Sequence, residues 1–121
     1  PVMIPGPAEH EEEMIAVNQV LKKDGIYYAI YHGRGKKTET RPKPPWSTCL
    51  ATSRDRVHWT KCAANPLFPP AENKSSGIFV WDGQRYLLYT MHDVVYRHVP
   101  AKAGAVSSPR LKTLPKVDIR P

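Results

Sequence analysis

A pattern that occurs twice at one constant spacing constrains this chain more than any other feature of its sequence. An Asp-Gly pair, two tyrosines and a preceding apolar pair recur together: Asp24, Gly25, Tyr28, Tyr31 and Val20-Leu21 return as Asp82, Gly83, Tyr86, Tyr89 and Ile78-Phe79. A shared offset over six positions indicates a duplicated structural unit. The chain is therefore expected to contain two copies of one small structure.

Each copy is predicted to contain a β-hairpin. The Asp-Gly pair tolerates the positive φ angles of a two-residue hairpin turn. The run after Asp24-Gly25, residues 26–31, is apolar or aromatic, as in a strand covered on both faces. The segment before it, residues 14–22, has apolar residues at helical spacing and would also suit an amphipathic helix. Its counterpart, residues 75–81, is short, β-branched and interrupted by glycine, so a strand is predicted in both places and the helix is the alternative.

Further strands are predicted over residues 47–52 and 58–62 in the first copy, and 77–81, 85–91 and 94–99 in the second. The expected fold is all-β, built from antiparallel four-stranded sheets of the kind that form β-propeller blades. Residues 1–67 would hold a lead-in and one blade, residues 68–100 a partial blade, and residues 101–121 an irregular basic tail. About two blades make an incomplete propeller, so a homo-oligomer or the missing remainder of a propeller is expected to cover the open sheet faces.

Composition excludes several classes of protein. The net charge of +7 and the 13 prolines are concentrated in loops and at the ends, notably residues 34–43 and 100–121. Basic residues are not interleaved with aromatic ones, which argues against a nucleic-acid surface. No apolar run approaches the ~20 residues of a membrane-spanning helix, so no membrane partner is expected. Cys49 and Cys62 fall roughly opposite each other in a predicted hairpin; two separate thiols are favoured over a disulfide.

Several phrases resemble one family of enzymes. Lys23-Asp24-Gly25 with Tyr27, Tyr28 and Tyr31, the segment Leu50 to Lys61 with its His58-Trp59 pair, and Asn65-Pro66 are similar to blades of the five-bladed β-propeller glycoside hydrolases, the arabinanase, β-xylosidase and invertase-like enzymes. The similarity spans roughly residues 6–100. It implies a propeller that acts on or binds a poly- or oligosaccharide and is secreted or periplasmic. A non-catalytic, lectin-like propeller built from short chains is the alternative, and an inactive fragment is a third.

The resemblance also implies where a site would lie. These enzymes use two carboxylates that face the propeller channel, one of them a proton donor. Glu13 is the expected acid, and in an extended chain Glu11 would share its face. Residues expected to contact sugar are His10, Glu11, Asn73, Lys74, Ser75, His92 and Asp93. The second carboxylate would belong to a blade encoded before Pro1. No cofactor is expected, although His92 would suit a structural divalent ion.

Overall fold

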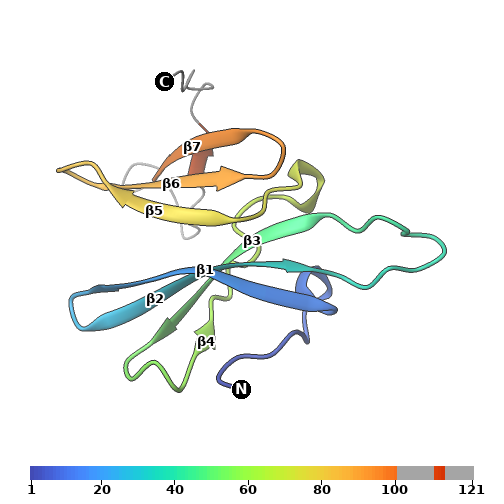
Figure 1. The fold of residues 1–121 in the computed structure, drawn as a ribbon, viewed down its shortest axis with the longest axis horizontal. Helices are drawn as coiled ribbons and strands as arrows, with labels where there is room; N and C mark the ends of the chain where they lie inside the picture. Colours follow the sequence, from blue (N-terminus) through green and yellow to red (C-terminus); the bar gives the residue numbers. More distant parts are fainter. Residues whose placement is uncertain (101–110, 114–121) are drawn as a thin grey trace.

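The computed structural model describes residues 1–100 and 111–113 and shows an all-β chain with two antiparallel sheets (Figure 1). The first sheet has the order β1-β2-β3-β4, with strands Met14–Lys23, Ile26–Arg34, Trp46–Ser53 and Thr60–Lys61. The second has the order β5-β6-β7-β8, with strands Gly77–Trp81, Tyr86–Met91, Val95–Pro100 and Leu111–Thr113. Two short 3₁₀ helices, η1 (Glu9–Glu11) and η2 (Pro70–Glu72), each precede a sheet. The prediction of a strand rather than a helix over residues 14–22 is confirmed.

The two Asp-Gly hairpins differ in length although their sequences are duplicated. Asp24 and Gly25 have φ angles of 51° and 78°, and Lys23 pairs with Ile26 across a two-residue turn. In the second copy the turn has four residues, because β5 ends at Trp81 and this residue pairs with Tyr86.

An aspartate side chain explains the longer turn. Asp82 Oδ1 accepts hydrogen bonds of 2.9 Å from the backbone N–H groups of both Gln84 and Arg85. These bonds hold the chain in a wider loop. The consequence is a different register: Leu21 faces Tyr28, whereas Phe79 faces Leu88.

A β-bulge in β1 changes which side chains face which way. The pairing of β1 with β2 shifts between Val17 and Gln19, so Asn18 is the extra residue. Before the bulge Val17 pairs with Tyr31, and after it Val20 pairs with Ala29. Because alternate residues of β2 share a face, both valines lie on the same side of the sheet despite their spacing of three.

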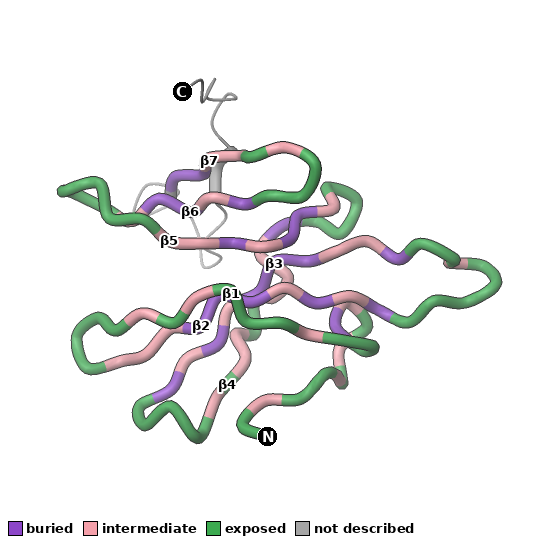
Figure 2. Tube along the Cα trace, viewed as in Figure 1, coloured by how far each residue is buried: buried purple, intermediate pink, exposed green. Residues whose placement is uncertain are grey.

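The buried residues form two clusters, one between the two sheets and one on the other face of the first sheet (Figure 2). One cluster joins the facing sides of both sheets: Ile30, Phe68 and Leu88, with Leu50, Leu67 and Phe79 packed against them. A second cluster lies on the opposite face of the first sheet: Ala29, Tyr31, Cys49 and Ala51, with Met3, Ile15 and Trp59 against it. Gly77 allows the close approach of β5, since an added Cβ would lie 2.9 Å from Ile30 Cγ1.

The ends of both sheets differ from expectation. The fourth strand of the first sheet is only Thr60–Lys61, because the preceding residues are held in a turn organised by Asp55. No strand was expected after Pro100, yet Leu111–Thr113 pairs with β7 and completes a fourth strand. The other residues of the predicted irregular tail, 101–110 and 114–121, lie outside the described residues.

Cys49 and Cys62 are both free thiols. Among the described residues, no helix is long and apolar enough to cross a bilayer.

Candidate functional site

A cavity of about 470 Å³ opens where the two sheets meet, at the end opposite the Asp24-Gly25 turn. Its lining combines an aromatic ring, three cations, an amide and an imidazole with a proline-rich stretch: Arg34, Lys37, Pro42, Lys43, Pro44, Pro45, Trp46, Asn73 and His92. These residues come from the end of β2, the start of β3, the loop between them, and the segments before β5 and after β6. The cavity therefore depends on contact between both copies of the repeat.

Trp46 lines this cavity and is held by contacts of both its ring and its backbone. It begins β3, and its ring lies 5.0 Å from the Arg34 guanidinium and 5.2 Å from the His32 ring in an edge-on arrangement. Its backbone N–H donates a 2.8 Å hydrogen bond to Asn73 Oδ1. Asn73 is held in turn by its left-handed backbone, with a φ of 51°, at the end of η2. The bond occupies the Asn73 oxygen and leaves its NH₂ group as a donor beside the ring.

His92 presents an acceptor to the same space. The Ser75 hydroxyl donates to the backbone oxygen of Met91 at 2.8 Å, and Ser75 Oγ lies 3.4 Å from His92 Nδ1. Since the single Ser75 proton is used, Nδ1–H of the neutral ring is the donor in this second contact. The remaining ring nitrogen, Nε2, is then an acceptor. Together with Asn73, the cavity offers both a donor and an acceptor of hydrogen bonds.

Glu13, the expected proton donor, lies at the rim and is paired. Arg34 donates to Glu13 Oε2 from Nε at 3.0 Å and from Nη2 at 2.7 Å. Both hydrogen bonds use the same carboxylate oxygen of Glu13 as the acceptor. The expectation that Glu11 and Glu13 share one face is wrong, because η1 turns the chain at Glu9–Glu11 and buries Glu11 while Glu13 stays half exposed.

The other predicted contact residues separate into two groups. Asn73 and His92 line the cavity and Ser75 supports His92 from behind. Lys74 is buried instead, with Nζ 3.3 Å from the centre of the Tyr96 ring. Asp93 is exposed in the turn between β6 and β7. His10 and Glu11 lie in η1 and do not line the cavity.

Glu11 is the centre of a buried polar cluster under the lead-in. Its Oε1 lies 2.5 Å from Lys61 Nζ, and its Oε2 accepts a 2.7 Å hydrogen bond from the Tyr31 hydroxyl. Lys61 also donates to the carbonyl oxygens of Ile4 and Gly6, each at 2.7 Å. The ammonium thus ties the N-terminal segment to the carboxylate and to β4.

This cluster has the residue types of a metal site but is already neutralised. Ligand atoms of His10, Glu11 and Cys49 lie within 4.8 Å of one another. Burial is the main cause that raises the pKa of Cys49 to about 12, with the nearby Glu11 charge adding to it, so the thiol is protonated. Burial also lowers the pKa of His10. Because Lys61 already supplies the positive charge next to Glu11, the arrangement anchors the lead-in without an ion.

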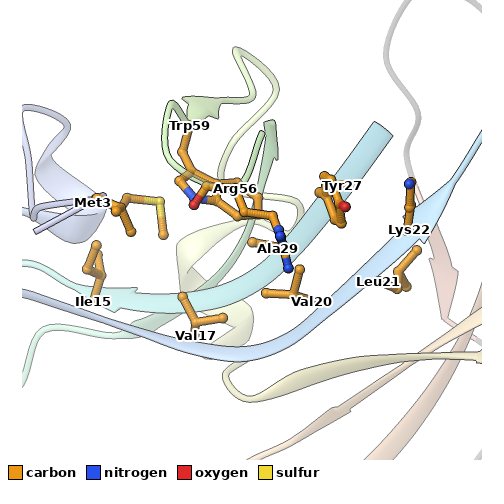
Figure 3. Close-up of a pocket in the computed structure, with 11 residues that line it drawn as sticks. Met3, Ile15, Val17, Val20, Leu21, Lys22, Tyr27, Ala29, Arg56 and Trp59 are labelled. Atoms are coloured by element: carbon orange, nitrogen blue, oxygen red, sulfur yellow. The ribbon is translucent and has the colours of Figure 1, made fainter. Parts of the chain in front are cut away.

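A second and larger cavity, of about 670 Å³, lies over the face of the first sheet that points away from the second sheet (Figure 3). Val17 and Val20 of β1 and Ala29 of β2 form its floor, and Trp59 and Arg56 reach over it from the turn before β4. Val17 and Val20 are 49% and 47% exposed. Most of its lining is apolar, and its polar side chains, Lys22 and Arg56, both lie over the Tyr27 ring, so it is best described as an uncovered packing face.

Comparisons with protein-family models, curated proteins and solved structures found no match to this chain.

Sequence reasoning missed four of the residues that line this cavity: Arg34, Lys37, Lys43 and Trp46. All four lie in or beside the basic, proline-rich connection between β2 and β3, where the composition predicts a loop. The signal that could have identified them is the position of Trp46 directly after Pro44-Pro45, at a strand start on the same edge as residues 73–75.

Proposed function

We propose that this chain is a glycoside hydrolase-like portion of a β-propeller that binds a poly- or oligosaccharide in the cavity beside Trp46. The observation that carries the proposal is the placement of Trp46, with its ring against Arg34 and its backbone fixed by Asn73. An aromatic wall with a few fixed donors and acceptors is typical of small-molecule sites. The flat apolar face of a sugar ring suits the indole, and its hydroxyl groups suit Asn73 and His92.

The propeller arrangement is supported by the way the sheets pack. The second sheet covers one face of the first through Ile30, Leu50 and Leu88. The opposite face, at Val17 and Val20, has no covering sheet among the described residues. In a propeller a further sheet of the same kind packs there, supplied by the remainder of the ring or by another copy of the chain.

Binding is favoured over hydrolysis. Glycosidases place two carboxyl groups across the scissile bond, roughly 5–10 Å apart. Among the described residues that line the cavity none is a carboxylate. Hydrolysis is the second candidate because Glu13 is held by Arg34, which does line it. Glu13 would then be the acid and the second carboxylate would come from another blade.

Calorimetric titration with neutral arabino-, xylo-, fructo- and galacto-oligosaccharides tests the proposal. At least one sugar should bind, and Trp46→Ala should weaken it about tenfold or more, as expected for loss of an aromatic anchor. Trp81→Ala is the matched control, because Trp81 is 53% exposed on β5 outside the cavity. Trp46→Phe keeps an aromatic ring and should retain part of the affinity. This result would show that the affinity lost in Trp46→Ala does not come from general unfolding.

Two results would overturn parts of the proposal. If no oligosaccharide binds, whether neutral or acidic, or if Trp46→Ala and Trp81→Ala behave alike, the cavity is not a sugar site. Release of reducing ends by the chain, abolished by Glu13→Gln, would favour the hydrolase over the lectin-like alternative.

A further inference from the structure

We infer that the saccharide bound beside Trp46 carries an anionic group, a carboxylate or a sulfate, which is held by Lys37 and Lys43. This inference rests on the function proposed above and specifies the substrate class of the same site. It depends on which cations of the cavity are already paired, on how the loop that carries them is held, and on the absence of acids in the lining.

The basic residues around the cavity fall into paired and unpaired sets. Arg34, Lys36 and Arg41 are bound to three of the four glutamates in residues 9–13, namely Glu13, Glu12 and Glu9 respectively. Lys37 and Lys43 line the cavity and form no ion pair with any described residue. These three glutamates are therefore bound by neighbours of the two lysines, and Glu39, the remaining acid of the loop, is exposed and does not line the cavity. The cavity keeps an excess of positive charge that a neutral sugar would leave uncompensated.

The loop that carries the two lysines, residues 35–45, is pinned to the rest of the first sheet. Thr38 and Arg41 exchange two backbone hydrogen bonds, of 3.0 and 3.1 Å. The Arg41 side chain binds Glu9 of η1 and the backbone oxygen of Lys36. Gly35 allows this contact, because an added Cβ would overlap the Glu9 carbonyl oxygen. Lys37 and Lys43 thus flank a fixed turn, which reduces the entropic cost of bringing both charges to one ligand.

Lys37 and Lys43 also lie at the side of the cavity formed by the loop, whereas Asn73 and His92 come from the other sheet. The two sets can therefore act on different parts of one molecule. A sugar ring against Trp46 would present hydroxyl groups to Asn73 and His92 and an acidic substituent to the lysines. A uronate carboxylate and a sulfate ester share this chemistry, and both accept hydrogen bonds from ammonium groups.

The test compares oligosaccharides of equal length by calorimetry: neutral galactan, oligogalacturonate and sulfated galactan. One or both acidic sugars should bind the unmodified chain about tenfold more tightly than the neutral one at low salt, and 0.5 M NaCl should reduce this preference. The two acidic arms distinguish a carboxylate from a sulfate. The variant Lys37→Gln/Lys43→Gln should lose the preference, so that neutral and acidic sugars bind it with similar affinity.

A variant with the same loss of charge provides the control. Lys22→Gln/Lys23→Gln removes two positive charges at the Asp24-Gly25 end of the first sheet, away from the cavity. It should keep the preference for the acidic sugar.

Other results of these titrations would overturn either the inference of an anionic ligand or the proposed function. Equal binding of neutral and acidic sugars overturns the inference and leaves the proposed function standing. A preference that survives Lys37→Gln/Lys43→Gln, or that is lost equally in the control variant, also overturns it. Binding of a single-stranded DNA oligonucleotide as tightly as the acidic sugar would show a general polyanion surface instead. If no sugar of any kind binds, the proposed function itself fails.

Discussion

Gln19 binds both backbone polar groups of Phe79, donating from Nε2 to the carbonyl oxygen at 3.0 Å and accepting from the N–H at Oε1 at 2.6 Å. Gln19 follows the bulge in β1, and Phe79 lies in β5, so the contact joins the edge strands of the two sheets. One side chain thereby satisfies backbone groups of β5 that do not pair with β6. The bulge matters here because it turns Gln19 toward the second sheet.

Gln19→Met should destabilise the fold by about 1–3 kcal/mol, because it keeps the length of the side chain and leaves the Phe79 N–H and C=O without partners. The free energy of unfolding from urea titration is the measurement. Gln84→Met, in the exposed turn of the second hairpin, is the control and should change stability by less than about 0.5 kcal/mol. Equal effects of the two substitutions would show that the contact between the sheets contributes nothing.

Gly77→Ala should also destabilise the sheet interface, by about 1–3 kcal/mol, as overpacked cores do. The new methyl would lie 2.9 Å from Ile30 Cγ1 and 3.1 Å from Thr48 Cγ2. Thr48→Ser removes one of these two atoms and keeps the hydroxyl that bonds the Ser75 carbonyl. The double variant should therefore be more stable than the sum of the single effects, measured by urea unfolding. Strict additivity would contradict the predicted close contact.

Lys61→Met should cost about 3–5 kcal/mol, since it leaves the Glu11 carboxylate buried without its counter-ion. Glu11 is 2% exposed, and its other carboxylate contacts among the described residues are the Tyr31 hydroxyl at 2.7 Å and His10 Nε2 at 4.0 Å. Glu11→Gln combined with Lys61→Met should recover much of the loss, because the pair is then replaced by neutral groups. A double-mutant cycle on the free energy of unfolding measures this coupling, and a coupling near zero would show that the ion pair is dispensable.

Local sequence signals predicted the strands because turn chemistry and the repeat agree. Asp24-Gly25 has the positive φ angles that its residue types favour. The ambiguity over residues 14–22 has a structural cause: the bulge at Asn18 breaks the alternation of β1, so its apolar residues do not follow the period of two that is typical of a strand. Only comparison with the second copy could resolve it. The longer second turn was missed because Asp82 forms side-chain bonds that the Asp-Gly pair alone does not specify.

The candidate site was predicted in part, for a related reason. Asn73, Ser75 and His92 flank strands at one sheet edge, which the order of strands already indicates. The role of Trp46 depends on how the loop of residues 35–45 folds back and on where the second sheet packs. The burial of Glu11 depends on Lys61, which is far along the chain, and on a 3₁₀ turn with no strong sequence signal. Contacts of this kind are tertiary and leave no periodic pattern in the sequence.

The buried imidazole of His98 should make stability depend on pH. His98 lies in β7 with no exposed surface, and its Nε2 is 2.8 Å from the Thr90 hydroxyl oxygen. Burial, helped by the charge of Lys74, lowers its pKa to about 4. In the unfolded chain the same group takes up a proton near pH 6.5. Between these values the unfolded state binds more protons, so the free energy of unfolding should fall as the pH is lowered through this window.

At 1.36 kcal/mol per pKa unit, the full effect of His98 is about 3 kcal/mol between pH 6.5 and pH 4. Urea unfolding of the unmodified chain and of His98→Gln, measured from pH 7.5 to pH 4.5, tests this. Burial lowers the pKa of His10 and His32 as well, so both proteins should lose stability in acid. The variant should be less stable at pH 7.5, where its hydrogen bond to Thr90 is altered, and should show a shallower decline. Parallel curves would mean that His98 takes up its proton as readily in the folded chain as in the unfolded one.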